Sequence, residues 1–213
     1  MKLYNVKCIK DNTLVINGSG DSPLWNEAYI LTDFISPWDT KNPKKIEFRS
    51  LWDSKNLYFY FKVFDNEIYI DTKDNTKQSI SKSDRVELFF KIDDKLNPYY
   101  CLEIDPTSRI LDFIAYPERK FEFDWQWPKN NLLVKSEIKN DFFTVEGSIT
   151  LTSLHNFKLI NNNKIKTGIY RAKYNKNENS QYEPVWISWV NPKTKQPNFH
   201  VPQSFGELNL LEL

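Results

Sequence analysis

The sequence predicts an all-β fold, namely a two-sheet antiparallel β-sandwich of jelly-roll or immunoglobulin-like type with one or two short helical turns. Its 15 Phe, 11 Tyr and 7 Trp stand against one Met and five Gly, and aromatic residues favour pleated, half-buried strands. Residues 46–64 alternate apolar and polar residues around a short polar turn, which is the pattern of a hairpin. The second half of this hairpin, LYFYFKVF, is apolar on almost every residue. Both of its faces must therefore be covered, and a second sheet is the usual cover.

The other elements follow from similar patterns. The strand at 85–91 (RVELFFK) places apolar residues at every second position on one face, and Glu87 and Phe89 on the other. We also expect two short strands within 3–16, hairpins at 99–116 and 132–150, and strands at 168–174, 186–189 and 205–210. Helical turns are expected at 22–28 and 151–157, loops at 34–43 and 66–83, and an aromatic segment ending in proline at 121–128. With no linker-like tract, residues 1–213 are predicted to form one domain.

Charge and hydropathy exclude several classes of partner. The 29 basic and 28 acidic residues give a net charge of +1, so nothing predicts binding to nucleic acid or to an anionic membrane. No apolar run is long enough to span a membrane. The start, MKLYNVKCIK, lacks the apolar region of a signal peptide. We expect a cytoplasmic protein, or a periplasmic or extracellular one if a leader has been removed.

The chain offers few metal or redox motifs. Cys8 and Cys101 lie far apart in strand-like contexts and could form a disulfide or remain buried thiols. His155 and His200 are the only histidines, and no Cys/His zinc spacing is present. The P-loop, the dinucleotide-binding fingerprint and the nucleophile elbow are also absent from the sequence.

Six motifs in order resemble the family 9 carbohydrate-binding domains, especially their short, free-standing members. They are INGSGDSPLWNEA, FRSLWDSKNLYFYFKVFD, SDRVELFF, FTVEGSITLTSL, ISWVNP and FHVPQSFGELNL, and together they span Ile16 to Leu210. The resemblance implies a β-sandwich that binds sugars without catalysis. Such domains are often attached to enzymes that degrade plant polysaccharides, so association with glycan-degrading enzymes and a role in carbohydrate catabolism are implied as well.

The resemblance also implies site residues. In well-known members two tryptophans sandwich a terminal sugar, and a carboxylate in the D-x-V-E strand holds its hydroxyls. The carboxylate corresponds to Glu87, whereas the two ring positions carry Ser81 and Phe199 here. Some members hold structural calcium, but the resemblance maps no ligand set onto Asp65 or its neighbours, and no other cofactor is expected.

The residues themselves support a sugar site independently. A pyranose needs aromatic rings for its C–H faces and charged or amide groups for its hydroxyls. Glu87, Glu103, Glu146, Arg49 and Arg171 lie in mid-strand positions, and would form one charged cluster if their strands are neighbours. Alternatively, these charges are structural ion pairs on a partly wetted sheet.

Five further residues could supply rings or line the site. Trp125 and Trp127 alternate and so share a face, as an exposed platform or as core. Trp38 and Phe199 lie in predicted loops, where ligand contacts are common. His200 could line the site or satisfy a nearby backbone group. We predict Glu87, Arg49 and Arg171 as polar contacts, with Phe199 and either Trp125 or Trp38 as stacking rings.

Two rival functions remain at the level of sequence. A glycoside hydrolase needs two carboxylates across a bound sugar, and Glu87 with Glu103 could supply them. A haem or electron-transfer domain would draw on His, Met or Cys for axial ligands. The scarcity of these residues disfavours haem, and the resemblance to binding modules disfavours hydrolysis.

Overall fold

The computed structural model describes residues 1–212. The strands are β1 (Leu3–Cys8), β2 (Ile46–Trp52), β3 (Asn56–Phe64), β4 (Arg85–Lys91), β5 (Tyr99–Ile104), β6 (Ile110–Tyr116), β7 (Lys120–Glu122), β8 (Leu132–Ile138), β9 (Phe142–Thr150), β10 (Ile160–Asn161), β11 (Lys164–Lys176), β12 (Tyr182–Ser188) and β13 (Gly206–Leu210). The helices are α1 (Lys77–Ser81) and α2 (Leu151–Asn156), and the 3₁₀ turns are η1 (Pro23–Asn26), η2 (Pro117–Arg119) and η3 (Pro202–Ser204).

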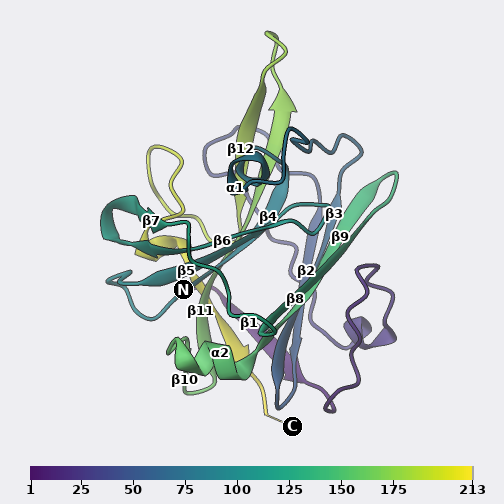
Figure 1. Cartoon of the computed structure of the whole chain (residues 1–213), viewed down its shortest axis with the longest axis vertical. Coiled ribbons are helices and arrows are strands. Elements are labelled where there is room, and N and C mark those ends of the chain that lie inside the picture. Colours follow the sequence, from purple (N-terminus) through teal and green to yellow (C-terminus); the bar gives the residue numbers. More distant parts are fainter. Residues whose placement is uncertain (213) are drawn as a thin grey trace.

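The strands form two packed sheets joined through β1 (Figure 1). The first sheet runs β7-β6-β5-β4-β11-β13, and the second runs β2-β3-β9-β8. Strand β1 pairs in parallel with β13 at one end and with β2 at the other, whereas the remaining strand pairs are antiparallel. Strand β12 extends β11 into a long hairpin that projects at the top of the view (Figure 1). This arrangement is the predicted two-sheet sandwich.

Most predicted elements are present, with two differences. Residues 3–16 contain one strand, β1, because the chain leaves the sheet after Cys8. The predicted loop at 66–83 contains the one-turn helix α1, which Thr76 caps by accepting a hydrogen bond from the backbone N–H of Ser79. The predicted helical turns are observed as η1 and α2.

Alternation along β4 divides its side chains between two cores. Val86, Leu88 and Phe90 point between the sheets into the main core, as predicted. On the opposite face, which we call the outer face of the first sheet, Phe89 packs in a second cluster with Tyr170. The loop residues that follow β12 fold back over this cluster, so the outer face is not simply exposed to solvent.

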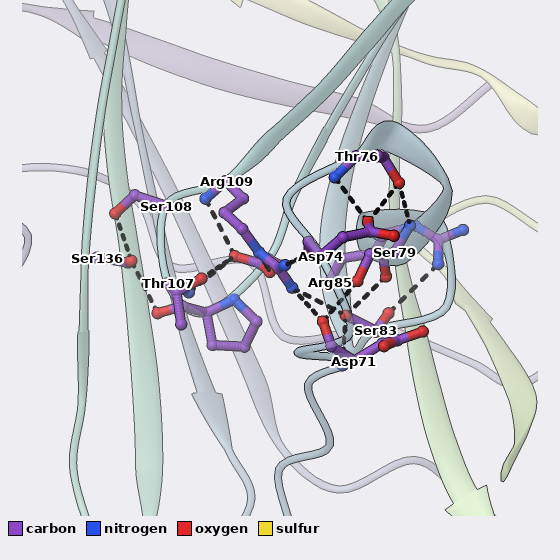
Figure 2. A network of polar contacts seen from close by, with 12 residues as sticks. Asp71, Asp74, Thr76, Ser79, Ser83, Arg85, Thr107, Ser108, Arg109 and Ser136 are labelled. Atoms are coloured by element: carbon purple, nitrogen blue, oxygen red, sulfur yellow. Dashed lines mark hydrogen bonds and ion pairs between the residues drawn. The ribbon is translucent and has the colours of Figure 1, made fainter.

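A polar network fastens the 66–83 segment against the first sheet (Figure 2). Arg109 donates to the carboxylate of Asp105, to the backbone carbonyls of Asp71 and Asp74, and to the hydroxyl of Ser83. Because Arg109 satisfies several carbonyls at once, the segment has a fixed course over β4 and β6. The segment in turn supplies carbonyl acceptors to Arg85, at the start of β4.

The structure describes the state of the cysteines and the character of the helices. Cys8 and Cys101 are both free thiols, and Cys101 is buried. Within residues 1–212, none of the helices has the length and apolar character needed to cross a bilayer.

Candidate functional site

A cavity of about 310 Å³ opens on the outer face of the first sheet, and we call it the ring pocket. Strands β4, β5 and β6 form its floor, and its walls come from the segments 36–43, 117–124 (with η2 and β7) and 191–200, together with Ser81 of α1 and Trp186 of β12. Its lining is rich in aromatic side chains with a small charged group at the floor. The lining residues are Trp38, Ser81, Arg85, Glu87, Phe89, Glu103, Leu111, Phe113, Arg119, Phe121, Phe123, Trp186, Pro197, Asn198, Phe199 and His200.

The charged floor consists of Arg85, Glu87 and Glu103. Glu87 and Glu103 are direct partners on the neighbouring strands β4 and β5, and Arg85 lies two residues before Glu87, so all three share the outer face. Nε of Arg85 lies 2.5 Å from Oε2 of Glu103 and 3.0 Å from Oε1 of Glu87. Two carboxylates therefore compete for one guanidinium.

Of the two carboxylates, Glu87 is the one that receives no hydrogen bond from Arg85. The Nε–H of Arg85 is donated to Glu103, and its Nη1 donates to the carbonyls of Ser81 and Ser83. Oε1 of Glu87 receives no hydrogen bond, although the side chain is only 2% exposed. Burial and the neighbouring charge of Glu103 raise the pKa of Glu87, against the opposing effect of Arg85.

Phe199 is a fixed part of the pocket wall. Its ring stacks on Tyr170 with centroids 4.1 Å apart, and it contacts Trp38 and Trp186 at 5.4 and 5.8 Å. The indole N–H of Trp38 donates to the carbonyl of Thr194, which fixes that ring. Because Phe199 is 5% exposed, the half-buried rings of Trp38 and Trp186 offer more surface to a ligand.

The remaining wall carries further rings and one exposed cation. Phe123 is 48% exposed and contacts Phe121, and Arg119 is exposed on the same segment. His200 stacks on Phe89, and its Nδ1 lies 2.9 Å from the hydroxyl of Tyr99. Burial and the charge of Arg119 lower the pKa of His200 to about 3, so its imidazole is neutral near pH ~7.

The structure brings together five of the nine predicted site residues. Glu87, Glu103, Trp38, Phe199 and His200 all line the ring pocket. Ser81 also lines it, so both positions that correspond to the tryptophan pair of the resembled family lie at this cavity. Arg49, Arg171, Trp125 and Trp127 lie elsewhere.

Arg171 is separated from Glu87 by the thickness of the sheet. It lies directly opposite Val86 in the register of β11 and β4, and so faces the interior between the sheets. There it pairs with Asp65 and lies 3.5 Å from Asp84. The expectation that Arg171 joins Glu87 on one face is therefore wrong, because its position in the strand has the opposite parity.

Arg49 and Glu146 lie on the far side of the sandwich, on the outer face of the second sheet. Arg49 donates to the carbonyl of Trp25 and lies 3.3 Å from Glu47. Glu146 accepts from the indole of Trp25 and from the backbone N–H groups of residues 17 and 18. These charges are used to hold the N-terminal segment, and the predicted single charged cluster is divided among three surfaces.

Trp125 and Trp127 share a face, as predicted, but that face is the main core. Trp127 is buried, and its indole N–H donates to Ser153. Trp125 packs on Tyr100 and Phe157 with centroids 5.4 and 5.8 Å apart. The exposed-platform interpretation of this pair is therefore wrong.

Sequence reasoning did not propose Arg85, Phe121 or Phe123 as site residues, although all three line the pocket. Arg85 had a usable signal, because it stands two residues from Glu87 in the same strand and must share its face. The aromatic alternation of FEFDW at 121–125 was also visible. Which of its rings reach a cavity depends on the path of the loop, which single-sequence patterns do not give.

The acidic residue Asp65 does not fit a calcium site. Its carboxylate is taken up by Arg171, Lys173 and Lys44, so cationic side chains stand where a metal ion would have to bind. Among residues 1–212, no group of three or more His, Cys, Asp or Glu side chains converges as a metal site.

A ring-lined cavity with a few convergent charged groups on a two-sheet sandwich defines a small-ligand-binding domain rather than a scaffold alone. The model of the carbohydrate family 9 binding domain-like family matches residues 16–213. The chain therefore belongs to this family. No curated protein sequence matches the chain.

Solved structures show the same fold at low sequence identity. A candidate carbohydrate-binding protein from Bacteroides uniformis is 17% identical, with 99% of each chain covered and a TM-score of 0.74. A family 9 carbohydrate-binding module from Caldicellulosiruptor kristjanssonii in complex with glucose is 18% identical, with 99% of this chain and 96% of that chain covered and a TM-score of 0.64. A structure of such a module from the same organism with cellotriose gives 18% identity, 98% and 93% coverage and a TM-score of 0.63.

Proposed function

We propose that the ring pocket is the site at which this chain binds carbohydrate without catalysing a reaction. The observation that carries the proposal is Glu87, a buried carboxylate at the floor of a ring-lined cavity whose Oε1 accepts no hydrogen bond. Glu87 shares its one cation, Arg85, with Glu103, so a sugar hydroxyl that donates to the Glu87 carboxylate would add a hydrogen bond that the protein does not supply. Membership of a carbohydrate-binding family supports the same function.

The dimensions of the cavity favour a small saccharide. A volume of about 310 Å³ lies at the lower end of the range of ligand pockets, ~300–1,000 Å³. Trp38 and Trp186 would contact the C–H faces of a sugar ring, while Glu87 accepts from a hydroxyl at the floor. The arrangement suits one or two sugar rings that enter from the loop side, rather than a long chain lying across the sheet.

The position of Arg85 argues against glycoside hydrolysis. A hydrolase needs its acid and its second carboxylate on either side of the bond that breaks. Here the guanidinium nitrogen stands within 3.0 Å of both Glu87 and Glu103. The two carboxylates therefore flank an arginine at the floor and leave no room for a glycosidic bond between them. Turnover of a glycan that Glu87→Gln abolishes would overturn this conclusion.

Titration calorimetry with glucose and with cellotriose tests the proposed site. Glu87→Ala should weaken binding strongly, and Glu178→Ala, which removes an exposed carboxylate at the tip of the β11–β12 hairpin, should leave it unchanged. Equal affinities for wild type and Glu87→Ala would contradict the proposal. A cellular role in glycan catabolism, in association with glycan-degrading enzymes, is proposed from the family alone.

A further inference from the structure

The floor of the ring pocket carries more negative than positive charge. Glu87 and Glu103 supply two carboxylates and Arg85 supplies one guanidinium, and all three side chains are buried. Charges in a site sheltered from water interact far more strongly than exposed ones, so this excess of negative charge costs free energy. A proton, a water network or a cationic ligand must compensate it.

One guanidinium compensates the charge of only one of the two carboxylates. Arg85 donates Nε–H to Glu103 at 2.5 Å, and Nη1 to the carbonyl of Ser81 at 2.7 Å and that of Ser83 at 3.3 Å. These acceptors hold it toward Glu103 and the 66–83 segment. Oε1 of Glu87 lies 3.0 Å from Nε but outside hydrogen-bond geometry.

The other titratable groups around the floor do not carry a compensating charge. His200 is neutral because burial lowers its pKa, and burial raises the pKa values of Cys101, Tyr170 and Tyr174, which keeps them neutral. Arg119 is exposed at the pocket's edge, where solvent and salt screen its charge. Among the described residues lining the pocket, Arg85 is the one buried cation.

We propose that the ring pocket prefers sugars with a free ammonium group, that is, amino sugars such as glucosamine, with Glu87 as the counterion. This inference rests on the proposed function and names the ligand class of that same site. An ammonium group offers three donors and a compact positive charge, so it would both donate to the Glu87 carboxylate, which lines the pocket, and offset the excess of negative charge. A hydroxyl of a neutral sugar would only donate a hydrogen bond.

Proton exchange distinguishes the two kinds of ligand. The pKa of Glu87 is raised in the empty pocket, because burial and Glu103 disfavour its charged form. A bound ammonium favours the charged form and lowers that pKa again. Binding of an amino sugar therefore releases protons from Glu87, whereas a neutral sugar, which brings no charge, releases fewer.

The test is titration calorimetry of the full chain with glucosamine, glucose and N-acetylglucosamine. The titrations are run near pH ~6.5, below the usual ~7.7–8.0 of an α-amino group, so that the sugar amine is protonated. Each is repeated in two buffers with different ionisation enthalpies. We expect glucosamine to bind ~10-fold or more tightly than glucose, the low end for a charge-assisted hydrogen bond. We also expect an excess proton release for glucosamine alone.

Matched variants connect the preference to Glu87. Glu87→Gln keeps the shape and removes the charge, so the affinity ratio of glucosamine to glucose should fall to about one, while Glu178→Gln should keep the wild-type ratio. Glucose binding with no preference for glucosamine, or an equal proton release for both sugars, would overturn this inference and leave the proposed function standing. Binding of none of the three sugars would count against the proposed function itself. The buffer comparison on wild type needs no variant to fold.

Discussion

Strands β4 and β11 separate two buried charged clusters that differ in one respect. On the inner face, Arg171 and Lys173 meet Asp65 and Asp84, so two buried cations face two buried carboxylates, and the exposed Lys44 also reaches Asp65. On the outer face, the single guanidinium of the ring pocket meets two carboxylates. The inner cluster is balanced, and the outer cluster is not.

Under the proposed function, this difference separates charges that stabilise the fold from charges that are left for a ligand. In the inner cluster, Asp65 also accepts from the backbone N–H of Glu67, and Asp84 from that of Tyr174. Although burial opposes ionisation, the charge of Arg171 holds the pKa of Asp65 below its usual range. Both inner carboxylates accept hydrogen bonds from the protein, whereas Oε1 of Glu87 in the outer cluster accepts none. Four predictions test this contrast.

The largest effect is expected when the inner cluster loses its arginine. Arg171→Met leaves Asp65 and Asp84 buried with less compensation, and breaking a buried pair in this way costs about 3–5 kcal/mol. Urea denaturation should show that loss in the free energy of unfolding. A loss below about 1 kcal/mol would mean that the inner cluster contributes no more than a surface pair does.

The next effect concerns binding. Glu87→Ala should weaken sugar binding by about 1.5–3 kcal/mol, the range for hydrogen bonds to charged groups. Its free energy of unfolding should stay the same or rise, because Arg85 keeps Glu103 as its partner. Calorimetric and denaturant titrations of the same variant measure both quantities. A variant with full affinity and reduced stability would place Glu87 with the structural charges.

A smaller effect is expected from the rings. Trp186→Ala should weaken sugar binding by about 0.5–1.5 kcal/mol beyond the area it buries, a typical aromatic contribution. Trp125→Phe is the matched control, because Trp125 packs on the main core away from the pocket. The pocket would be the wrong site if the Trp125 variant lost affinity and the Trp186 variant did not.

The last prediction concerns the dependence of stability on pH. Because the pKa of Glu87 is raised in the folded state, the folded chain binds more protons than the unfolded chain above the unfolded value. Stability should therefore decline as pH rises from ~4.5 toward ~8, with a slope below ~1.4 kcal/mol per pH unit. Glu87→Gln should flatten this decline in denaturant titrations across the interval. An unchanged slope would show that Glu87 is not the group that titrates.

Much of the fold could be predicted from the sequence because it depends on local alternation. The pattern of residues 85–91 places Glu87 and Phe89 on the outer face, as observed. Strand β1 was harder, because its parallel pairing with β13 and β2 joins segments that are distant in the chain. Local patterns carry no information about such neighbours.

Only part of the site could be predicted, because parity along one strand does not decide which residues of other strands share its face. Glu87 and Glu103 share a face because β4 and β5 are neighbours in a register that places them opposite each other. The prediction for Arg171 was wrong because the face on which Arg171 lies depends on how β11 pairs with β4, which the sequence of one strand does not reveal. The exposure of Trp127 likewise depends on which core the loop after β7 packs against, and alternation alone does not determine it.

A crystal structure of the chain with glucose is the most direct test of the ring pocket as the carbohydrate site. The proposal requires the sugar to lie against Trp38 or Trp186, with a hydroxyl within ~2.5–3.0 Å of a Glu87 oxygen. Glucose ordered at another surface, with the ring pocket holding only water at the same sugar concentration, would contradict it.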